Sequence, residues 1–124
     1  TTGREGGRKG GFRALAERWA TPELRATNPA AVAKTKAMIQ GTSVNGYTGS
    51  CAAVRDFDFW NKVGGIKAPT LVIAGTHDAA VPPADGQKLA HAISGARYTE
   101  LSAAHISNIE DAVRFTAEVR AFLK

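Results

Sequence analysis

The stretch Pro69-Thr-Leu-Val-Ile-Ala-Gly-Thr-His-Asp-Ala-Ala-Val-Pro-Pro83 decides how this sequence of 124 residues folds. Its first half, from Pro69 to Gly75, is a short apolar run rich in β-branched residues and bounded by proline and glycine. Such a run is typical of a strand that is buried on both faces. The second half is polar and ends in two prolines, so it predicts a loop, and the acidic residue Asp78 stands in that loop.

A second strand and further helices are predicted downstream of this stretch. The segment from Gln87 to Ile93 has helical character and ends before Gly95, and Arg97 to Leu101 has the pattern of another strand. The order strand, helix, strand, helix is typical of parallel sheets with right-handed crossovers. We therefore predict an α/β fold. Its sheet is incomplete within this chain, because parallel strands expect neighbours and sheets average about five or six strands.

The loops that follow the two strands are the expected location of any chemistry, because ligands bind outside the carboxyl ends of strands in open α/β sheets. Asp78 follows the first strand and His105 follows the second. A Ser-His-Asp site needs both groups: the imidazole takes the proton of the nucleophile, and the carboxylate fixes the tautomer of the imidazole. Asp85 is the rival acid, but it lies past the prolines at a helix start, where a carboxylate favours the helix dipole.

The closing segment predicts a helix that opens with a capping box, Ser107-Asn-Ile-Glu110. In such a box the serine oxygen and the glutamate carboxylate satisfy free backbone N–H groups at the helix start. It would fix the backbone beside His105, as an accurately aimed imidazole requires. The helix is predicted to carry a stripe of side chains, namely Ile109, Val113, Thr116, Val119 and Leu123.

The first half of the chain is predicted to consist of short helices joined by brief turns. Residues 12–19 have apolar side chains at helical spacing. Thr21-Pro22 and Asn28-Pro29 look like N-caps followed by proline at the first helical position, and Gly41 can end the second of these helices. The segment from Tyr47 to Val54 predicts another helix.

Composition excludes several classes of protein. Hydrophobic residues make up 44% and charged residues 22%, which is ordinary for a globular domain and unlike a disordered chain. Residues 1–11 contain five glycines and four charged residues, so we expect a flexible segment that is not a signal peptide. No apolar run approaches the roughly 18 residues that span a membrane, so no membrane partner is expected.

The net charge of +5 raises the possibility of nucleic-acid binding, but the placement of the charge argues against it. The basic residues outside the first eighteen positions are scattered, and no aromatic side chains alternate with them to stack bases. A mild positive field would suit a small anionic substrate. The single cysteine, Cys51, fits a cytoplasmic location and is interpreted as a small buried hydrophobe. Three separated histidines give no metal signature.

Five stretches of the chain match a known pattern. They are Arg-Trp (18–19), Gly-Tyr-Thr-Gly-Ser-Cys (46–51), Ile-Lys-Ala-Pro-Thr-Leu-Val-Ile-Ala-Gly-Thr-His-Asp (66–78), Gly-Ala-Arg-Tyr-Thr-Glu-Leu (95–101) and Ala-His-Ile-Ser-Asn-Ile-Glu (104–110). Together they resemble the α/β-hydrolase family and, within it, the 3-oxoadipate enol-lactonases. The resemblance begins near Phe12. It implies that residues 12–62 are a helical cap and that residues 63–124 are the C-terminal part of the core.

The resemblance implies that a small anionic lactone or ester, specifically 3-oxoadipate enol-lactone, is hydrolysed to 3-oxoadipate during aromatic degradation without a cofactor. It implies that Asp78 orients His105 as the catalytic base. For Trp19 and Tyr47 it leaves two roles open: these side chains line the substrate pocket, or they anchor the cap to the core.

The serine nucleophile of that family has no counterpart in the sequence. The Gly-x-Ser-x-Gly elbow is missing, since Gly49-Ser50-Cys51 lacks the second glycine. We therefore expect a fragment, or one half of a two-chain molecule, that is inactive without an N-terminal half bearing the serine. Two alternatives stay open. One is another α/β-hydrolase, such as a broad esterase or a C–C hydrolase. The other is an inert fragment that pairs with another chain through a sheet edge, which includes a homo-oligomer.

Overall fold

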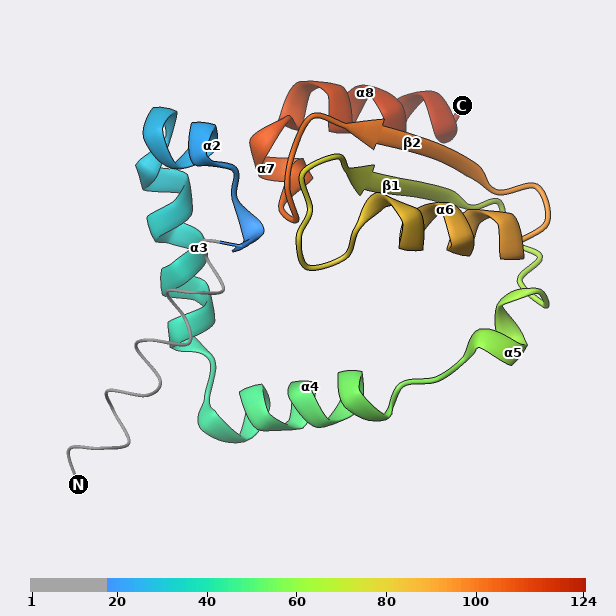
Figure 1. Cartoon of the computed structure of the whole chain (residues 1–124), viewed down its shortest axis with the longest axis horizontal. Helices are drawn as coiled ribbons and strands as arrows, with labels where there is room; N and C mark the ends of the chain where they lie inside the picture. The colour runs from blue at the N-terminus through green and yellow to red at the C-terminus, as the bar shows by residue number, and fades with distance from the viewer. Residues whose placement is uncertain (1–17) are drawn as a thin grey trace.

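The computed structural model of the chain describes residues 18–124 (Figure 1). The elements, in chain order, are α2 (Pro22–Thr27), α3 (Pro29–Gly41), α4 (Val44–Asp56), α5 (Trp60–Val63), β1 (Leu71–Gly75), α6 (Pro83–Ala92), β2 (Arg97–Leu101), α7 (Ser107–Glu110) and α8 (Ala112–Phe122). The predicted flexible segment 1–11 and most of the predicted helix 12–19 lie outside the described residues. Within the described range, no helix has the length and hydropathy that crossing a membrane requires.

Side-chain caps set where the helices of the first half begin. The hydroxyl of Thr21 accepts a hydrogen bond of 3.1 Å from the backbone N–H of Leu24 at the start of α2. The side chain of Asn28 accepts one of 3.1 Å from Ala31 at the start of α3. In both helices proline occupies the first position, where no N–H partner is needed. Both predicted N-caps are confirmed, and α3 ends at Gly41, as predicted.

Helix α4 differs from its prediction in its bounds, Val44–Asp56, and in the exposure of its cysteine. It begins at Val44 rather than at Tyr47, because the Ser43 hydroxyl accepts a hydrogen bond of 3.1 Å from the N–H of Gly46 and so caps an earlier turn. The thiol of Cys51 is exposed, so the prediction of a buried cysteine is wrong for this chain. The reason is that no residue of α4 is buried, and Figure 1 shows this helix well away from the sheet.

The two strands form a parallel pair in which Leu71 lies opposite Arg97 and Gly75 lies opposite Leu101. The predicted α/β order and the bounds of the second strand are therefore confirmed. The first strand begins at Leu71, slightly later than predicted. Helix α6 connects the strands. It begins at Pro83, in line with the expected entry of this helix through Pro82-Pro83, because proline is well accommodated in the first turn of a helix.

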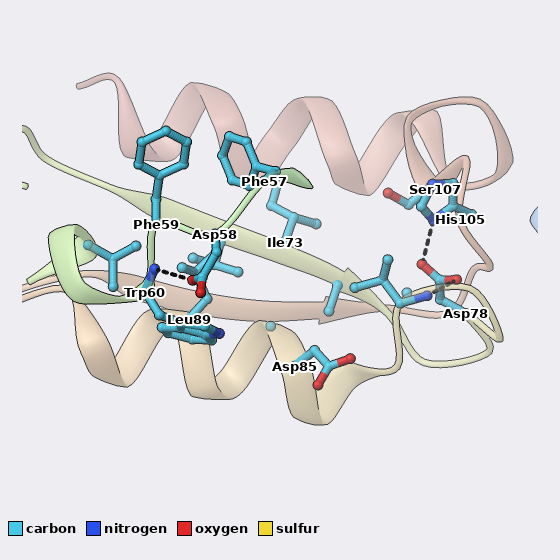
Figure 2. Close-up of a pocket in the computed structure, with 16 residues that line it drawn as sticks. Phe57, Asp58, Phe59, Trp60, Ile73, Asp78, Asp85, Leu89, His105 and Ser107 are labelled. Carbon is cyan, nitrogen blue, oxygen red and sulfur yellow. Dashed lines mark hydrogen bonds and ion pairs between the residues drawn. The ribbon is translucent and has the colours of Figure 1, made fainter. Parts of the chain in front are cut away.

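The sheet lies between two helices. Figures 1 and 2 show α6 on one side of the strands and α8 on the other. On the α6 side, a side chain at Gly86 would contact Tyr98 and Ala74, so this helix approaches both strands closely. On the α8 side, the Arg97 guanidinium lies 5.9 Å from the centre of the Phe122 ring. The two-stranded sheet thus has the layered arrangement of an α/β protein.

The first strand is less buried than predicted. Only Gly75 is buried, and the other residues of β1 are half-buried. In the sheet that residues 18–124 form, β1 pairs with β2 alone. Its other edge therefore has no strand beside it within this range, which explains why neither face of β1 is fully covered.

Helix α8 does not continue the helix that begins at Ser107. Asp111 interrupts it with φ of −124° and ψ of 57°, ends α7, and caps α8 by accepting a hydrogen bond from Arg114. The predicted stripe is wrong for most of its residues. Ile109, Val113, Thr116 and Leu123 are exposed, and only Val119 is half-buried. The half-buried aromatic and aliphatic side chains of α8 are Phe115, Val119 and Phe122.

Candidate active site

Asp78 and His105 face each other beyond the carboxyl ends of the two strands, as Figure 2 shows. Because the strands are parallel neighbours, their ends lie at the same edge of the sheet. The distance from His105 Nδ1 to Asp78 Oδ2 is 2.8 Å. An ionised carboxylate can only accept a hydrogen bond, so the proton of this bond lies on Nδ1. The juxtaposition expected from the sequence is therefore observed, and the catalytic roles of the two residues stay a prediction.

The loop after β1 uses the two oxygens of Asp78 for different purposes. Oδ1 accepts hydrogen bonds of 2.7 Å from the N–H of Ala80 and 2.9 Å from the N–H of Val81, which closes a turn in the way that aspartate commonly does. Oδ2 is thereby aimed at His105. The turn-forming role that aspartate often has after a strand and the pairing with histidine thus occur in the same side chain.

The carboxyl of Asp78 is held in its ionised form. Its side chain is 8% exposed, whereas that of His105 is 34% exposed. Burial alone would raise the pKa of Asp78. The hydrogen bonds from Val81, His105 and Ala80 outweigh burial, so the pKa lies below its ordinary value. At neutral pH the imidazole of His105 therefore faces a negative charge.

The loop that carries His105 is held tightly against the end of β1. The N–H of His77 donates a hydrogen bond of 3.0 Å to the carbonyl of Ala103. A Cβ atom on Gly75 would lie 2.3 Å from the carbonyl oxygen of Ala104, the residue before His105. Only glycine permits this approach of two backbone segments. Sequence reasoning did not single out Gly75, although a glycine at the end of a strand is a signal for close backbone approach.

Trp19 is brought to the candidate site from the other half of the sequence. Its ring centre is 5.2 Å from that of His105, with the planes tilted by 34°. Its carbonyl accepts a hydrogen bond of 3.3 Å from the N–H of Ile106. Neither Trp19 nor Tyr47, which lies on α4, is among the residues that line the cavity beside His105.

A cavity of about 490 Å³ extends from the His105–Asp78 pair along β1. At its far end is a cluster of aromatic side chains, Phe57, Phe59 and Trp60, which we call the aromatic cluster. The rival acid, Asp85, also lines the cavity, but Figure 2 shows it on α6 and apart from the pair. Sequence reasoning missed the aromatic cluster. The available signal was the density of aromatic residues between Phe57 and Trp60.

The capping box predicted for Ser107 and Glu110 does not form. Ser107 is the first residue of α7, and this helix has no side-chain cap. Glu110 instead accepts a hydrogen bond of 2.8 Å from the N–H of Ala104 through Oε2, and it accepts the hydroxyl proton of Thr21 through Oε1. The capping box is replaced because the hydroxyl of Thr21 and the N–H of Ala104, which both lie outside α7, are within hydrogen-bonding distance of the Glu110 carboxylate.

Among the residues that the structure describes, no three His, Cys, Asp or Glu side chains come together as a metal ion would require. No known family profile matches the chain. A hydrolase from Pseudomonas aeruginosa superposes on it with a TM-score of 0.86 at 36% identity, covering 93% of this chain and 43% of that one. The layered parallel sheet and this likeness show that the chain has the fold of the C-terminal part of proteins of the α/β-hydrolase superfamily.

Within that superfamily the chain is similar to enol-lactonases. The 3-oxoadipate enol-lactonase 2 of Acinetobacter baylyi is 36% identical over 109 residues, which are 88% of this chain and 41% of that enzyme. The enol-lactonase from Burkholderia xenovorans superposes with a TM-score of 0.85 at 45% identity, covering 94% of this chain and 46% of that one. The chain thus spans less than half the length of the relatives that it matches.

Proposed function

We propose that this chain forms the acid and base part of a carboxylic ester hydrolase that opens an enol-lactone. The observation that carries the proposal is the hydrogen bond of 2.8 Å between His105 Nδ1 and Asp78 Oδ2. Because Nδ1 holds the proton, the neutral imidazole presents an unprotonated Nε2. That nitrogen can act as a general base toward a group outside this pair.

The nucleophile in this proposal is a serine from a segment that the 124 residues do not include. His105 Nε2 removes the serine proton, the serine oxygen attacks the lactone carbonyl, and the imidazolium returns the proton as the ring C–O bond breaks. In the second half of the reaction, His105 takes a proton from water, which attacks the acyl-enzyme. The imidazolium then returns this proton to the serine oxygen as the acyl C–O bond breaks and the acid is released. Asp78 stabilises the imidazolium in both halves, and its lowered pKa keeps it charged.

The proposed substrate class is a small lactone that carries a carboxylate. Two findings support it: the likeness to two enol-lactonases and the net charge of +5, which favours the approach of an anion. Residues 12–62 act as the helical cap in this proposal, and residues 63–124 form the C-terminal part of the core. The proposed chemistry uses no cofactor, and the single cysteine supports a cytoplasmic location.

The proposed partner is the half of the hydrolase that bears the nucleophile. Within residues 18–124, the edge of β1 that faces away from β2 has no strand beside it, so it could accept a further strand. The aromatic cluster beside it is unusually exposed for such large side chains, with exposures of 70% for Phe57, 43% for Phe59 and 45% for Trp60. Docking of the other half against this edge would bury the cluster and bring a serine toward His105.

The catalytic proposal is tested by substitution in the hydrolase that contains this chain. We expect Asp78→Asn and His105→Ala each to lower the turnover of enol-lactone by roughly 10⁴-fold or more. His91→Ala is the matched control, because His91 is exposed and its Nδ1 contacts only the carbonyl of Gln87 at 2.7 Å. Retained activity in either site variant would remove that residue from its role.

Substrate scope and partner are tested separately. Preferred turnover of an anionic enol-lactone over a neutral aryl ester is expected, and equal turnover would favour a broad esterase. Intact mass and peptide sequencing of the purified protein should reveal a Gly-x-Ser-x-Gly peptide on the same chain or on a second one. Size-exclusion chromatography showing a well-folded 124-residue monomer would argue against obligate pairing with another chain.

A further inference from the structure

We infer that Glu110 is a positioning residue that couples the backbone around His105 to the helical segment of residues 18–63. The inference rests on the proposed function only in taking His105 as the base. Glu110 itself touches neither the imidazole nor the cavity. It acts through the residue before His105 on one side and through Thr21 on the other.

The coupling consists of a continuous chain of hydrogen bonds. The N–H of Leu24 donates to the Thr21 hydroxyl at 3.1 Å, and this hydroxyl donates to Oε1 of Glu110. Oε2 of the same carboxylate accepts the N–H of Ala104 at 2.8 Å. The first turn of α2 is therefore linked through one side chain to the backbone N–H of Ala104, the residue before His105. Both carboxylate oxygens have a partner, so a displacement at either end alters the other.

The residue after His105 is tied to the same helical segment. The N–H of Ile106 donates to the carbonyl of Trp19 at 3.3 Å, and the Trp19 ring lies against the imidazole. The residues on both sides of His105, Ala104 and Ile106, are thus bonded through their N–H groups, directly or through Glu110, to residues 19–21. Ala20 is 3% exposed and Ala104 is 2% exposed, so this contact is packed as well as hydrogen-bonded. The orientation of His105 therefore depends on where this part of the helical segment sits.

Different substitutions separate the two tasks of Glu110. Glu110→Ala removes both acceptors and leaves the buried N–H of Ala104 without one. Glu110→Gln keeps a carbonyl acceptor for Ala104 and offers an amide that can donate to the Thr21 hydroxyl. Thr21→Val breaks the link between Glu110 and α2 and removes the side-chain cap of that helix, and Thr21→Ser restores a hydroxyl at the same place.

The readout is the tautomer of His105, followed by long-range ¹H–¹⁵N correlation spectra of the 124-residue chain at mildly alkaline pH, where histidine is ordinarily neutral. In the wild type and in Glu110→Gln we expect the protonated-Nδ1 form alone. In Glu110→Ala we expect the Nδ1 and Nε2 shifts to move toward each other as the second tautomer becomes populated. Asp111→Ala is the matched control, because Asp111 caps α8 through Arg114 and has no bond to the His105 loop.

The coupling to α2 has its own test. Thr21→Val should move the His105 shifts in the same direction as Glu110→Ala, and Thr21→Ser should restore them. Asn28→Ala is the control for Thr21→Val. It also removes a helix cap, but the Asn28 side chain accepts its hydrogen bond from Ala31 and is not linked to Glu110. A single protonated-Nδ1 tautomer in both Glu110→Ala and Thr21→Val would overturn the inference, and so would equal changes in the control variants.

The result is independent of whether lactones are hydrolysed. If the site variants Asp78→Asn and His105→Ala keep activity while the tautomer responds to Glu110, the proposed function fails and the positioning role stands. If those variants abolish turnover while the tautomer ignores Glu110, the reverse holds. If Glu110→Ala does not fold, Thr21→Val and Thr21→Ser still test the inference, because they leave the hydrogen bond of Ala104 in place.

Discussion

Replacing Gly75 by alanine adds one methyl group at the tightest backbone contact of the candidate site. The new Cβ would lie 2.3 Å from the Ala104 carbonyl oxygen and 2.5 Å from that of Ala103, where ordinary contact begins at 3.4 Å. The loop must therefore retreat by about 1 Å. A shift of that size is enough to break the hydrogen bond of 2.8 Å between His105 and Asp78. We expect a stability loss of about 1–3 kcal/mol and, in the complete hydrolase, a loss of activity of about 10²-fold.

Urea unfolding followed by tryptophan fluorescence measures the stability change, and the His105 tautomer measures the geometric one. Gly49→Ala is the matched control, since a Cβ there meets nothing within 4 Å and the residue lies inside α4. It should stabilise the chain by up to about 1 kcal/mol. If Gly75→Ala leaves both the unfolding midpoint and the tautomer of His105 unchanged, the close approach at the strand end does not constrain the site.

Burial and charge set three further outcomes. Leu101→Ala removes a side chain of 0% exposure and should cost about 2–5 kcal/mol in urea unfolding, whereas Val113→Ala, at 84% exposure, should change stability by less than about 0.5 kcal/mol; equal losses would contradict the observed core. Burial and the neighbouring Glu100 raise the pKa of Tyr98 to about 12, so the tyrosine absorbance of a Tyr47→Phe variant should titrate near that value. The free energy of unfolding should fall as pH rises toward it, because the folded chain keeps a proton that the unfolded chain loses. The lowered pKa of Asp78 stabilises the fold at pH values above the ordinary carboxyl pKa of about 3.9, and this stabilisation is lost as pH falls through the pKa of Asp78 in the folded chain. The Asp78→Asn variant should therefore lose less stability in acid than the wild type, and identical acid profiles would refute this contribution.

The features that were predictable from the sequence are those set by neighbours along the chain. The second strand was predicted with its observed bounds because the helix before it and the loop after it both have clear signals. The pairing of Asp78 with His105 followed from one further rule, that neighbouring parallel strands end at the same edge. The N-caps at Thr21 and Asn28 were equally local.

The features that were missed depend on contacts between distant parts of the chain. Ser107 and Glu110 have the spacing of a capping box, yet Glu110 bonds to Thr21, which no local pattern includes. The helix break at Asp111 was also missed, because a single aspartate within an apolar pattern did not indicate a break. The burial expected for Cys51 assumed a packing partner for α4 that the described residues do not supply.

The two strands end side by side, with Gly75 opposite Leu101, and this limits the conformational freedom of the site. Asp78 and His105 are each joined to the sheet by a tether of only a few residues, and both tethers start from the same edge of the sheet. Short tethers leave little conformational freedom to be lost when the groups meet, so the imidazole and the carboxylate are pre-organised before any substrate arrives. Lengthening either tether would lower the effective concentration of the Asp78 carboxylate near the His105 imidazole, even if all the hydrogen bonds described above could still form.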